Sequence, residues 1–269
     1  MPGTSLELGP TAAPIRLAVE PGPEALGRRV AARLLGALRD RAWGLRQRPL
    51  GLATGRTMEP VYAALRDDLA ALPGAERREL LAHWHSFNLD EYVGLGPADP
   101  RSFAATMAAA VGEPLGLAPA QLCLPDGLAA DPEVEAQRYA AAIAAAGGLG
   151  LQLLGLGSNG HVGFNEPPCG PEATCRCVEL APATRRQNAA DFGGDPEAVP
   201  RWAISLGLAE ILQAEELLLV VSGGAKAGIL RRALLEPPTA TVPASWLQRH
   251  PRLRVMVDAA AAAELSRGS

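Results

Sequence analysis

Short apolar runs alternate with longer alanine- and leucine-rich stretches along most of this 269-residue chain. The runs that we expect to be strands cover residues 15–19, 50–53, 84–88, 151–156, 217–221 and 253–257. The stretches that we expect to be helices cover roughly residues 23–40, 59–72, 132–146, 207–213 and 226–235. This alternation is typical of a parallel sheet with helices packed on it. The sequence therefore predicts an α/β fold, with a Rossmann-like, open, mostly parallel sheet covered by helices on both faces.

One α/β domain can accommodate a chain of this length, and the sequence contains no internal repeat. We expect residues 1–14 to form a flexible N-terminal tail and residues 15–269 to form a single domain. A stretch rich in proline, glycine and cysteine precedes a short extended segment at 176–180. We expect these parts to form a lid-like loop at about 167–182.

Composition narrows the range of partners. The net charge of −4 provides no basic footprint for nucleic acid, and no run of about 18 apolar residues could span a membrane. The first residues lack the basic and apolar regions of a secretory signal, so we expect a cytoplasmic protein. The spacing of the four cysteines fits neither a zinc ribbon nor C-x-x-C, so we expect free thiols and no metal site. The alternative is an improvised metal site in which the clustered Cys169, Cys175 and Cys177 act with His161.

The segment Leu151–Pro167, LQLLGLGSNGHVGFNEP, joins an apolar strand to glycine-rich turns that carry His161 and Glu166. Ligands of α/β proteins bind at the carboxyl ends of strands, and an imidazole next to a carboxylate is suited to proton transfer. The segment also contains G-x-G-x-x-G, but the proline- and glycine-rich continuation cannot form the helix that a dinucleotide site requires. We therefore expect His161 to be functional, with Glu166 orienting it.

Two further segments favour an anion site. The turn Thr54-Gly55-Arg56-Thr57 follows a strand and opens a helix, so its N–H groups, hydroxyls and guanidinium can surround a phosphate. The alternative is an ordinary helix cap by Thr57 with Arg56 in solvent. Lys226 is the only lysine among 25 basic residues and follows the strand expected at 217–221. An ammonium group at that place suits phosphate, although chance retention on a solvated helix is the alternative.

Asp90 and Glu91 follow another expected strand, at 84–88. A carboxylate in a partly dry pocket can have its pKa raised enough to act as a base near neutral pH. Adjacent acidic residues are also common on surfaces, but the neighbouring Phe87 and Tyr92 favour a shaped pocket. The other histidines have no comparable context, and we expect them to be structural or exposed: His83, His85 and His250.

Taken together, these segments resemble the glucosamine-6-phosphate deaminase (isomerase) family, within a larger group that includes 6-phosphogluconolactonases. The similar motifs span about residues 15–260 in the family's order: ATGRT, FNLDEYVGL, GLGSNGHVGFNEP, TRRQNA, LLLVVSGGAK and SWLQRHP. Residues 164–167, FNEP, favour the deaminase branch over the lactonases.

The resemblance implies an aldose–ketose isomerisation coupled to deamination in amino-sugar catabolism. D-Glucosamine 6-phosphate and water would give D-fructose 6-phosphate and ammonia, with no metal and no organic cofactor. By this resemblance Asp90 moves a proton between C2 and C1, and His161 opens the sugar ring with Glu166 beside it. Lys226 and the turn at 54–57 would hold the phosphate. The implied partner is a small amino-sugar phosphate, and a homo-oligomer is compatible with the family.

The chain departs from the family pattern near both expected sites. Asn159 stands where many members have aspartate, and we expect its amide oxygen to accept a hydrogen bond from the His161 imidazole. Arg56 replaces a usual glycine, and Ala190 replaces a usual phosphate-binding arginine. We hypothesise that Arg56 supplies the missing charge. Three alternatives stay open: a galactosamine-6-phosphate deaminase, a 6-phosphogluconolactonase, and a non-catalytic regulator that binds a sugar phosphate.

A third departure concerns activation. In activated members a serine and a basic residue of the loop after Pro167 bind N-acetylglucosamine 6-phosphate. Cys169 and Val178 occupy the corresponding places here, and only Arg176 matches. We therefore expect no activation by that compound.

Overall fold

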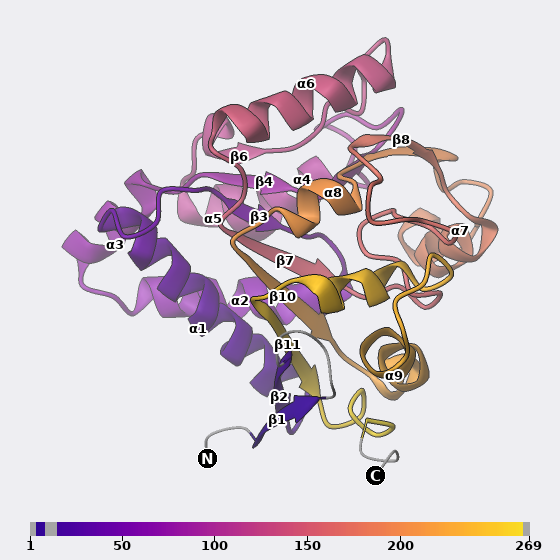
Figure 1. Cartoon of the computed structure of the whole chain (residues 1–269). Coiled ribbons are helices and arrows are strands. Elements are labelled where there is room, and N and C mark those ends of the chain that lie inside the picture. The colour runs from indigo at the N-terminus through magenta and orange to yellow at the C-terminus, as the bar shows by residue number, and fades with distance from the viewer. Residues whose placement is uncertain (1–3, 9–14, 266–269) are drawn as a thin grey trace.

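An eight-stranded sheet in the order β1-β2-β11-β10-β7-β3-β4-β6 forms the centre of the molecule (Figure 1). This computed structural model describes residues 4–8 and 15–265. All neighbours in the sheet are parallel except the pair β1–β2. The strands are β1 (Thr4–Leu8), β2 (Ile15–Glu20), β3 (Leu50–Leu52), β4 (Ser86–Asn88), β6 (Leu122–Cys123), β7 (Leu151–Gly155), β10 (Glu216–Val221) and β11 (Leu253–Asp258).

Helices cover both faces of this sheet, as predicted. Figure 1 shows α1 and α2 side by side on one face, while α8 and α9 lie on the other. The chain moves along the sheet in one direction through β3, β4 and β6 and returns in the other through β7, β10 and β11. Because each crossover is right-handed, the helices of the outward path and those of the return path lie on opposite faces of the sheet. The helices are α1 (Pro23–Ala42), α2 (Glu59–Ala70), α3 (Gly74–Ala82), α4 (Phe103–Met107), α5 (Glu113–Leu115), α6 (Pro132–Ala145), α7 (Pro182–Asn188), α8 (Leu208–Leu212) and α9 (Ala227–Leu235).

The sequence pattern explains these elements. In α1 the buried residues Leu26, Val30 and Leu34 recur at the spacing of one helix face. β10 reads ELLLVV and is buried along its whole length, as a strand covered on both faces must be. The side chain of Asp131 accepts hydrogen bonds from two backbone N–H groups at the start of α6, which fixes where that helix begins.

A three-stranded antiparallel sheet, in the order β5-β9-β8, lies beyond the end of β4. Its strands are β5 (Asp90–Tyr92), β9 (Trp202–Ser205) and β8 (Arg176–Glu179). The pattern predicted an extended segment at β8 but neither β5 nor β9. The region expected to be lid-like at 167–182 therefore contains a paired strand, and its closure over a ligand stays a prediction.

The expected N-terminal tail is structured in part. Thr4–Leu8 forms β1, which pairs antiparallel with β2, whereas residues 1–3 and 9–14 lie outside the described residues. In the segments that the structure describes, none of the helices combines the length and the apolar character needed to cross a bilayer.

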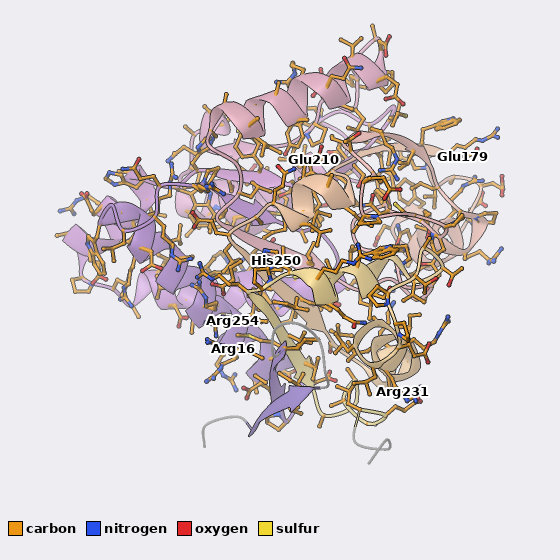
Figure 2. All side chains as sticks on the ribbon, in the orientation of Figure 1. Arg16, Glu179, Glu210, Arg231, His250 and Arg254 are labelled. Carbon is orange, nitrogen blue, oxygen red and sulfur yellow. The ribbon has the colours of Figure 1, made fainter. Side chains whose placement is uncertain are left out.

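Glu216, the first residue of β10, forms ion pairs with three arginines at the amino ends of the strands. The candidate motifs lie at the other end of the sheet, where the strands have their carboxyl ends. The Glu216 carboxylate is 1% exposed and receives two hydrogen bonds from Arg33, of 2.9 and 2.7 Å. Arg254, labelled on β11 in Figure 2, lies 2.9 Å from the same carboxylate, and Arg252 lies 3.5 Å away. Burial acts to raise the pKa of Glu216, but these arginines outweigh it and lower the pKa below its ordinary value.

Glu216→Gln should lower the free energy of unfolding at pH 7 by about 2 kcal/mol. The loss is smaller than the ~3–5 kcal/mol for breaking a fully buried pair, because Arg252 and Arg254 are 46% and 34% exposed and keep part of their hydration. A carboxyl group with a lowered folded pKa stabilises the protein above its unfolded pKa and loses this effect as the pH falls through the folded pKa. Urea unfolding at pH 7 and pH 3 should therefore give a smaller difference at pH 3, and an equal difference would contradict this account.

The neighbouring residue offers a matched control. Glu215 pairs with Arg46 and Arg48 at 3.7 and 3.4 Å, but its side chain is 29% exposed. Glu215→Gln should change the free energy of unfolding by at most about 0.5 kcal/mol, since water screens such pairs.

Candidate active site

A cavity of about 660 Å³ lies at the carboxyl ends of β3, β7 and β10. Cavities of this size commonly hold small molecules, and strand ends of an open α/β sheet are where such ligands bind. Its polar lining comes from separate parts of the sequence: Thr54, Arg56, Thr57, Asp90, Tyr92, Ser158, His161, Gln187, Asn188, Asp191, Ser222 and Lys226. The structure thus brings the predicted turn at 54–57, Asp90, His161 and Lys226 into one cavity.

One end of the cavity carries positive charge. The turn after β3 continues into a short 3₁₀ helix, Arg56–Met58, and then into α2. Gly55 has a φ of +131°, which a residue with a side chain rarely adopts. Burial lowers the pKa of Lys226, and the nearby guanidinium of Arg56 lowers it further. An anion bound between these two cations would offset both effects, because an opposite charge favours the charged form of Lys226.

The expected alternative for this turn was a helix cap by Thr57 with Arg56 in solvent. No side chain caps the 3₁₀ helix or the start of α2, so Thr57 does not serve as the cap. The hydroxyl of Tyr62 instead donates a 2.6 Å hydrogen bond to the carbonyl of Ala53 and fixes the turn from the helix side. Arg56 is exposed, as that alternative expected, and it also lines the cavity.

Asp90 and Glu91 lie next to each other on β5 and face different surroundings, as successive residues of a strand do. Asp90 lines the cavity and is 6% exposed. Burial and the neighbouring charge of Glu91 raise the pKa of Asp90 to about 8. The Glu91 carboxylate accepts hydrogen bonds of 2.8, 2.9 and 2.7 Å from the N–H groups of Tyr92, Phe103 and Ala104. Glu91 therefore anchors the start of α4, and Asp90 is the carboxyl group available to a ligand.

His161 lies on the turn after β7 with its imidazole buried against Gly157. A Cβ atom at Gly157 would lie 2.2 Å from Nε2 of the imidazole, so only glycine permits this approach. Nδ1 of His161 lies 3.4 Å from Oε2 of Glu166 and 3.5 Å from the hydroxyl of Thr184. Nε2 is thereby left for a ligand.

Glu166 and Asn159 stand behind His161 and do not line the cavity. Burial acts to raise the pKa of Glu166, but hydrogen bonds and the charge of His161, with further bonds from Thr184 and Asn159, lower it to about 2. Glu166 is therefore a carboxylate that can stabilise a protonated His161.

The expected contact between Asn159 and the imidazole is wrong. The Asn159 amide donates a 2.7 Å hydrogen bond to Glu166, and its oxygen accepts from the backbone N–H of His161 at 3.2 Å. The reason is that Glu166 and Thr184 already face Nδ1 of the ring.

Sequence reasoning missed the far wall of the cavity, which α7 and the residues after it provide. Asn188 donates a 2.9 Å hydrogen bond to the Tyr92 hydroxyl, and Ser158 donates one of 2.8 Å to Gln187. The motif TRRQNA was the available signal, but the sequence did not show which of its side chains reach the cavity. Arg56 lines the cavity, whereas Ala190 does not.

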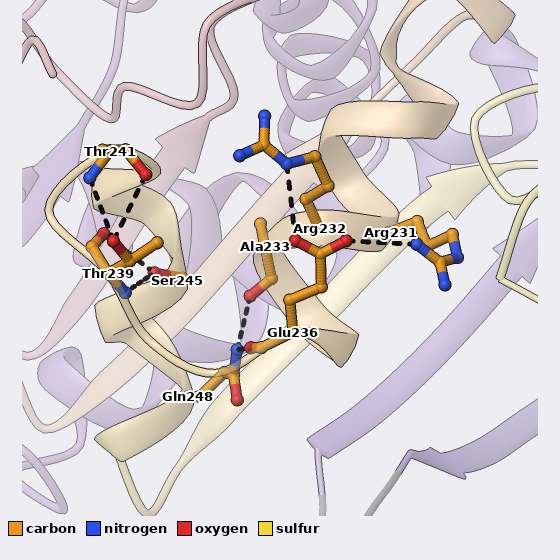
Figure 3. A network of polar contacts seen from close by, with 8 residues as sticks. All are labelled: Arg231, Arg232, Ala233, Glu236, Thr239, Thr241, Ser245 and Gln248. Atoms are coloured by element: carbon orange, nitrogen blue, oxygen red, sulfur yellow. Dashed lines mark hydrogen bonds and ion pairs between the residues drawn. The ribbon is translucent and has the colours of Figure 1, made fainter.

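The SWLQRHP motif lies outside the cavity and ties the chain after α9 together (Figure 3). The amide of Gln248 donates hydrogen bonds of 2.8 Å to the carbonyls of both Ala233 and Glu236 at the end of that helix. The Ser245 hydroxyl accepts from the N–H of Thr239 at 2.8 Å and closes the loop between them.

This tied segment supports the loop that carries His161. The N–H of Ala244 donates a 2.8 Å hydrogen bond to the carbonyl of Gly160, next to the histidine. The Trp246 indole donates one of 3.0 Å to the carbonyl of Cys169. The motif thus acts on the site through backbone contacts.

The remaining candidates lie away from the cavity. His250 is buried and bonds the carbonyl of Ala214, and neither it nor His83 nor His85 lines the cavity. The four cysteines are free, with Cys169 and Cys175 buried. Over residues 4–8 and 15–265, no three or more histidine, cysteine, aspartate or glutamate side chains gather closely enough to hold a metal ion.

Comparison with known proteins gives one consistent family. A family model described as glucosamine-6-phosphate isomerases/6-phosphogluconolactonase matches residues 21–256. Glucosamine-6-phosphate deaminase of Streptomyces avermitilis is 42% identical over 216 residues, which is 80% of this chain and 81% of that protein. The enzyme of the same name from Rhodopirellula baltica is 38% identical over 253 residues, 94% of this chain and 97% of that protein. The solved structure of a monomeric glucosamine-6-phosphate deaminase superposes with a TM-score of 0.82 at 31% identity, covering 92% of this chain and 99% of that one.

The carboxyl group of Asp90 should titrate with a pKa of about 8 in the free protein. Carbon-13 NMR of labelled aspartate measures it, and Asp90→Asn assigns the signal by removing it. In Glu91→Gln the pKa should fall but stay raised, because burial is the larger cause. A pKa near 4 in the unsubstituted protein would contradict the buried position of this carboxyl group.

Proposed function

This chain belongs to the glucosamine-6-phosphate isomerase/6-phosphogluconolactonase family, and from that premise we propose that it converts D-glucosamine 6-phosphate and water to D-fructose 6-phosphate and ammonia. The substrate phosphate binds between the turn at 54–57 and Lys226, where two cations and a helix start favour an anion. Binding the phosphate at this end directs the sugar carbons toward Asp90 and His161. An anchored phosphate fixes where the reacting carbons of a small substrate lie relative to these side chains.

His161 serves the ring-opening step. Its imidazole takes the proton of the C1 hydroxyl and returns one to the ring oxygen, so that the pyranose opens to the free aldehyde. Glu166 stabilises the protonated imidazole, and Asn159 holds Glu166 by a 2.7 Å hydrogen bond. Glu166 and Asn159 are positioning residues, since they reach the substrate only through His161.

Asp90 carries the isomerisation. Its carboxylate removes the proton from C2 while a proton of the substrate's ammonium group passes to the C1 oxygen, which gives a neutral enolamine. The proton held by Asp90 is then delivered to C1, which leaves an iminium group at C2. Water adds to the resulting iminium carbon at C2, and ammonia leaves as the C2 carbonyl of the ketose forms. A pKa of about 8 leaves Asp90 mostly protonated at neutral pH in the free protein, and the positive charge of a bound amino sugar shifts it toward the base form.

The observation that carries this proposal is the buried Asp90 carboxyl group in the same cavity as His161. A lactonase hydrolyses an ester and has no step for such a base between two carbons. A regulator that only binds a sugar phosphate has no use for a buried ionisable group with a raised pKa. The epimer galactosamine 6-phosphate is a second candidate substrate, because the exposed Arg56 lines the cavity beside the proposed phosphate position.

Asp90→Asn should reduce ammonia release from glucosamine 6-phosphate by about 10²–10⁴-fold or more, because the amide cannot accept the C2 proton. A coupled assay for ammonia and fructose 6-phosphate measures this, with galactosamine 6-phosphate run beside glucosamine 6-phosphate to identify the preferred epimer. The folded state of the variant is checked by thermal unfolding.

Two results would argue against the proposal. If the unsubstituted protein binds the phosphosugars but releases no ammonia from either, it is a binding protein. If Asp90→Asn keeps full activity, a different residue moves the proton.

Arg56→Ala should raise KM for glucosamine 6-phosphate roughly tenfold and change kcat little, because it removes a charged hydrogen bond made equally in ground and transition states. Arg56→Lys keeps the charge and should recover part of the loss. Arg78→Ala serves as the control, since Arg78 is exposed on α3 away from the cavity. An unchanged KM in Arg56→Ala would exclude Arg56 from phosphate binding.

A further inference from the structure

The buried side-chain amide of Asn88 lies directly behind the turn at 54–57. Asn88, the last residue of β4, is fully buried and does not line the cavity. Its Nδ2 atom donates a 2.8 Å hydrogen bond to the hydroxyl oxygen of Thr54, which does line the cavity. Asn88 thus reaches the ligand position only through Thr54.

The backbone around Asn88 is held from several sides. Asn88 pairs with Leu52 of β3 in the parallel sheet, and the N–H of Leu89 donates a 3.0 Å hydrogen bond to the carbonyl of Leu52. The Tyr139 hydroxyl donates a 2.8 Å hydrogen bond to the carbonyl of Asn88. The amide group is therefore presented to Thr54 from a rigid part of the sheet.

The direction of this hydrogen bond decides what Thr54 can do. An amide nitrogen only donates, so the Thr54 oxygen must accept and its proton must point elsewhere. Among the described residues no protein group accepts that proton, and Thr54 borders the cavity. The hydroxyl is thereby set as a donor to a ligand, which is the polarity that a phosphate oxygen needs.

The opposite amide orientation is less favourable. In the observed orientation the atom left without a partner is the Asn88 carbonyl oxygen, Oδ1. Turning the amide over would leave its N–H groups buried and unpaired, and unpaired buried N–H groups are rarer than unpaired carbonyl oxygens.

We propose that Asn88 is a positioning residue that fixes the Thr54 hydroxyl as a hydrogen-bond donor to the substrate phosphate. This inference rests on the proposed function for the identity of the substrate. It concerns ground-state binding of the phosphate, so it predicts an effect on KM and not on kcat.

Asn88→Ala should raise KM for glucosamine 6-phosphate roughly tenfold, the size expected for one hydrogen bond to a charged group, with kcat within about threefold. The dissociation constant of inorganic phosphate, measured by calorimetry, should rise by a similar factor. In a Thr54→Val background, which has lost the hydroxyl, Asn88→Ala should change either quantity less than twofold. A merely structural role would act equally in both backgrounds, and that result would overturn the inference.

Asn88→Asp has nearly the same size and keeps the test available if Asn88→Ala does not fold. Its carboxylate would accept the Thr54 proton and place a negative charge behind the anion site, so phosphate binding should weaken more than in Asn88→Ala. Binding of inorganic phosphate equal to that of the unsubstituted protein would contradict the inference. If the unsubstituted protein releases no ammonia, the proposed function fails, and phosphate calorimetry on the same variants still decides the role of Asn88.

Discussion

Parallel pairing of β4, β3, β7 and β10 brings their carboxyl ends to one edge of the sheet, and the candidate site depends on this arrangement. The register pairs Leu52 with Asn88 and Gly155 with Val220, so the chain leaves all four strands at a similar height. The turn at 54–57, Asp90, His161 and Lys226 each follow one of these ends. Residues far apart in the sequence therefore meet in one cavity, because the sheet supplies their placement.

Those parts of the fold and site that depend on local pattern could be predicted from the sequence. Apolar runs revealed six strands of the main sheet, and the residues after them revealed part of the cavity lining, but not the wall that α7 provides. β5 and β9 could not be predicted in this way, because Asp90–Tyr92 is polar and its partner Trp202–Ser205 is distant in the chain. The partner of Asn159 could not be predicted either. Glu166 and Thr184 come to lie beside Nδ1 of His161 only in the folded chain, and Asn159 bonds Glu166 instead of the imidazole.

Two carboxyl groups of the site affect stability in opposite ways. Because the pKa of Asp90 is raised on folding, its contribution to the stability of the fold is greatest when the pH is below 3.8, the pKa of the unfolded chain. This contribution is lost as the pH rises toward about 8. Each unit of such a shift corresponds to about 1.4 kcal/mol. The lowered pKa of Glu166, about 2, makes its contribution stabilising above the ordinary value of 4.5 and lost as the pH falls toward 2. Glu166 can thus stabilise the fold and serve the site together, whereas Asp90 can be kept ionisable in the cavity only at a cost in stability.

Two polar groups that line the cavity, the Thr54 hydroxyl and the His161 imidazole, have their hydrogen-bonding roles fixed by residues that do not line it. Asn88 donates to Thr54 and turns its hydroxyl outward, while Glu166 faces Nδ1 of His161 and leaves Nε2 for the ligand. These supporting residues are buried or partly buried, and each is held in turn, Asn88 by its strand and Glu166 by Asn159. A hydroxyl or imidazole free to rotate would present donor and acceptor in turn and would lose part of each hydrogen bond to a ligand. Chemistry that depends on which atom carries a proton therefore requires this second layer of residues as much as the groups that touch the substrate.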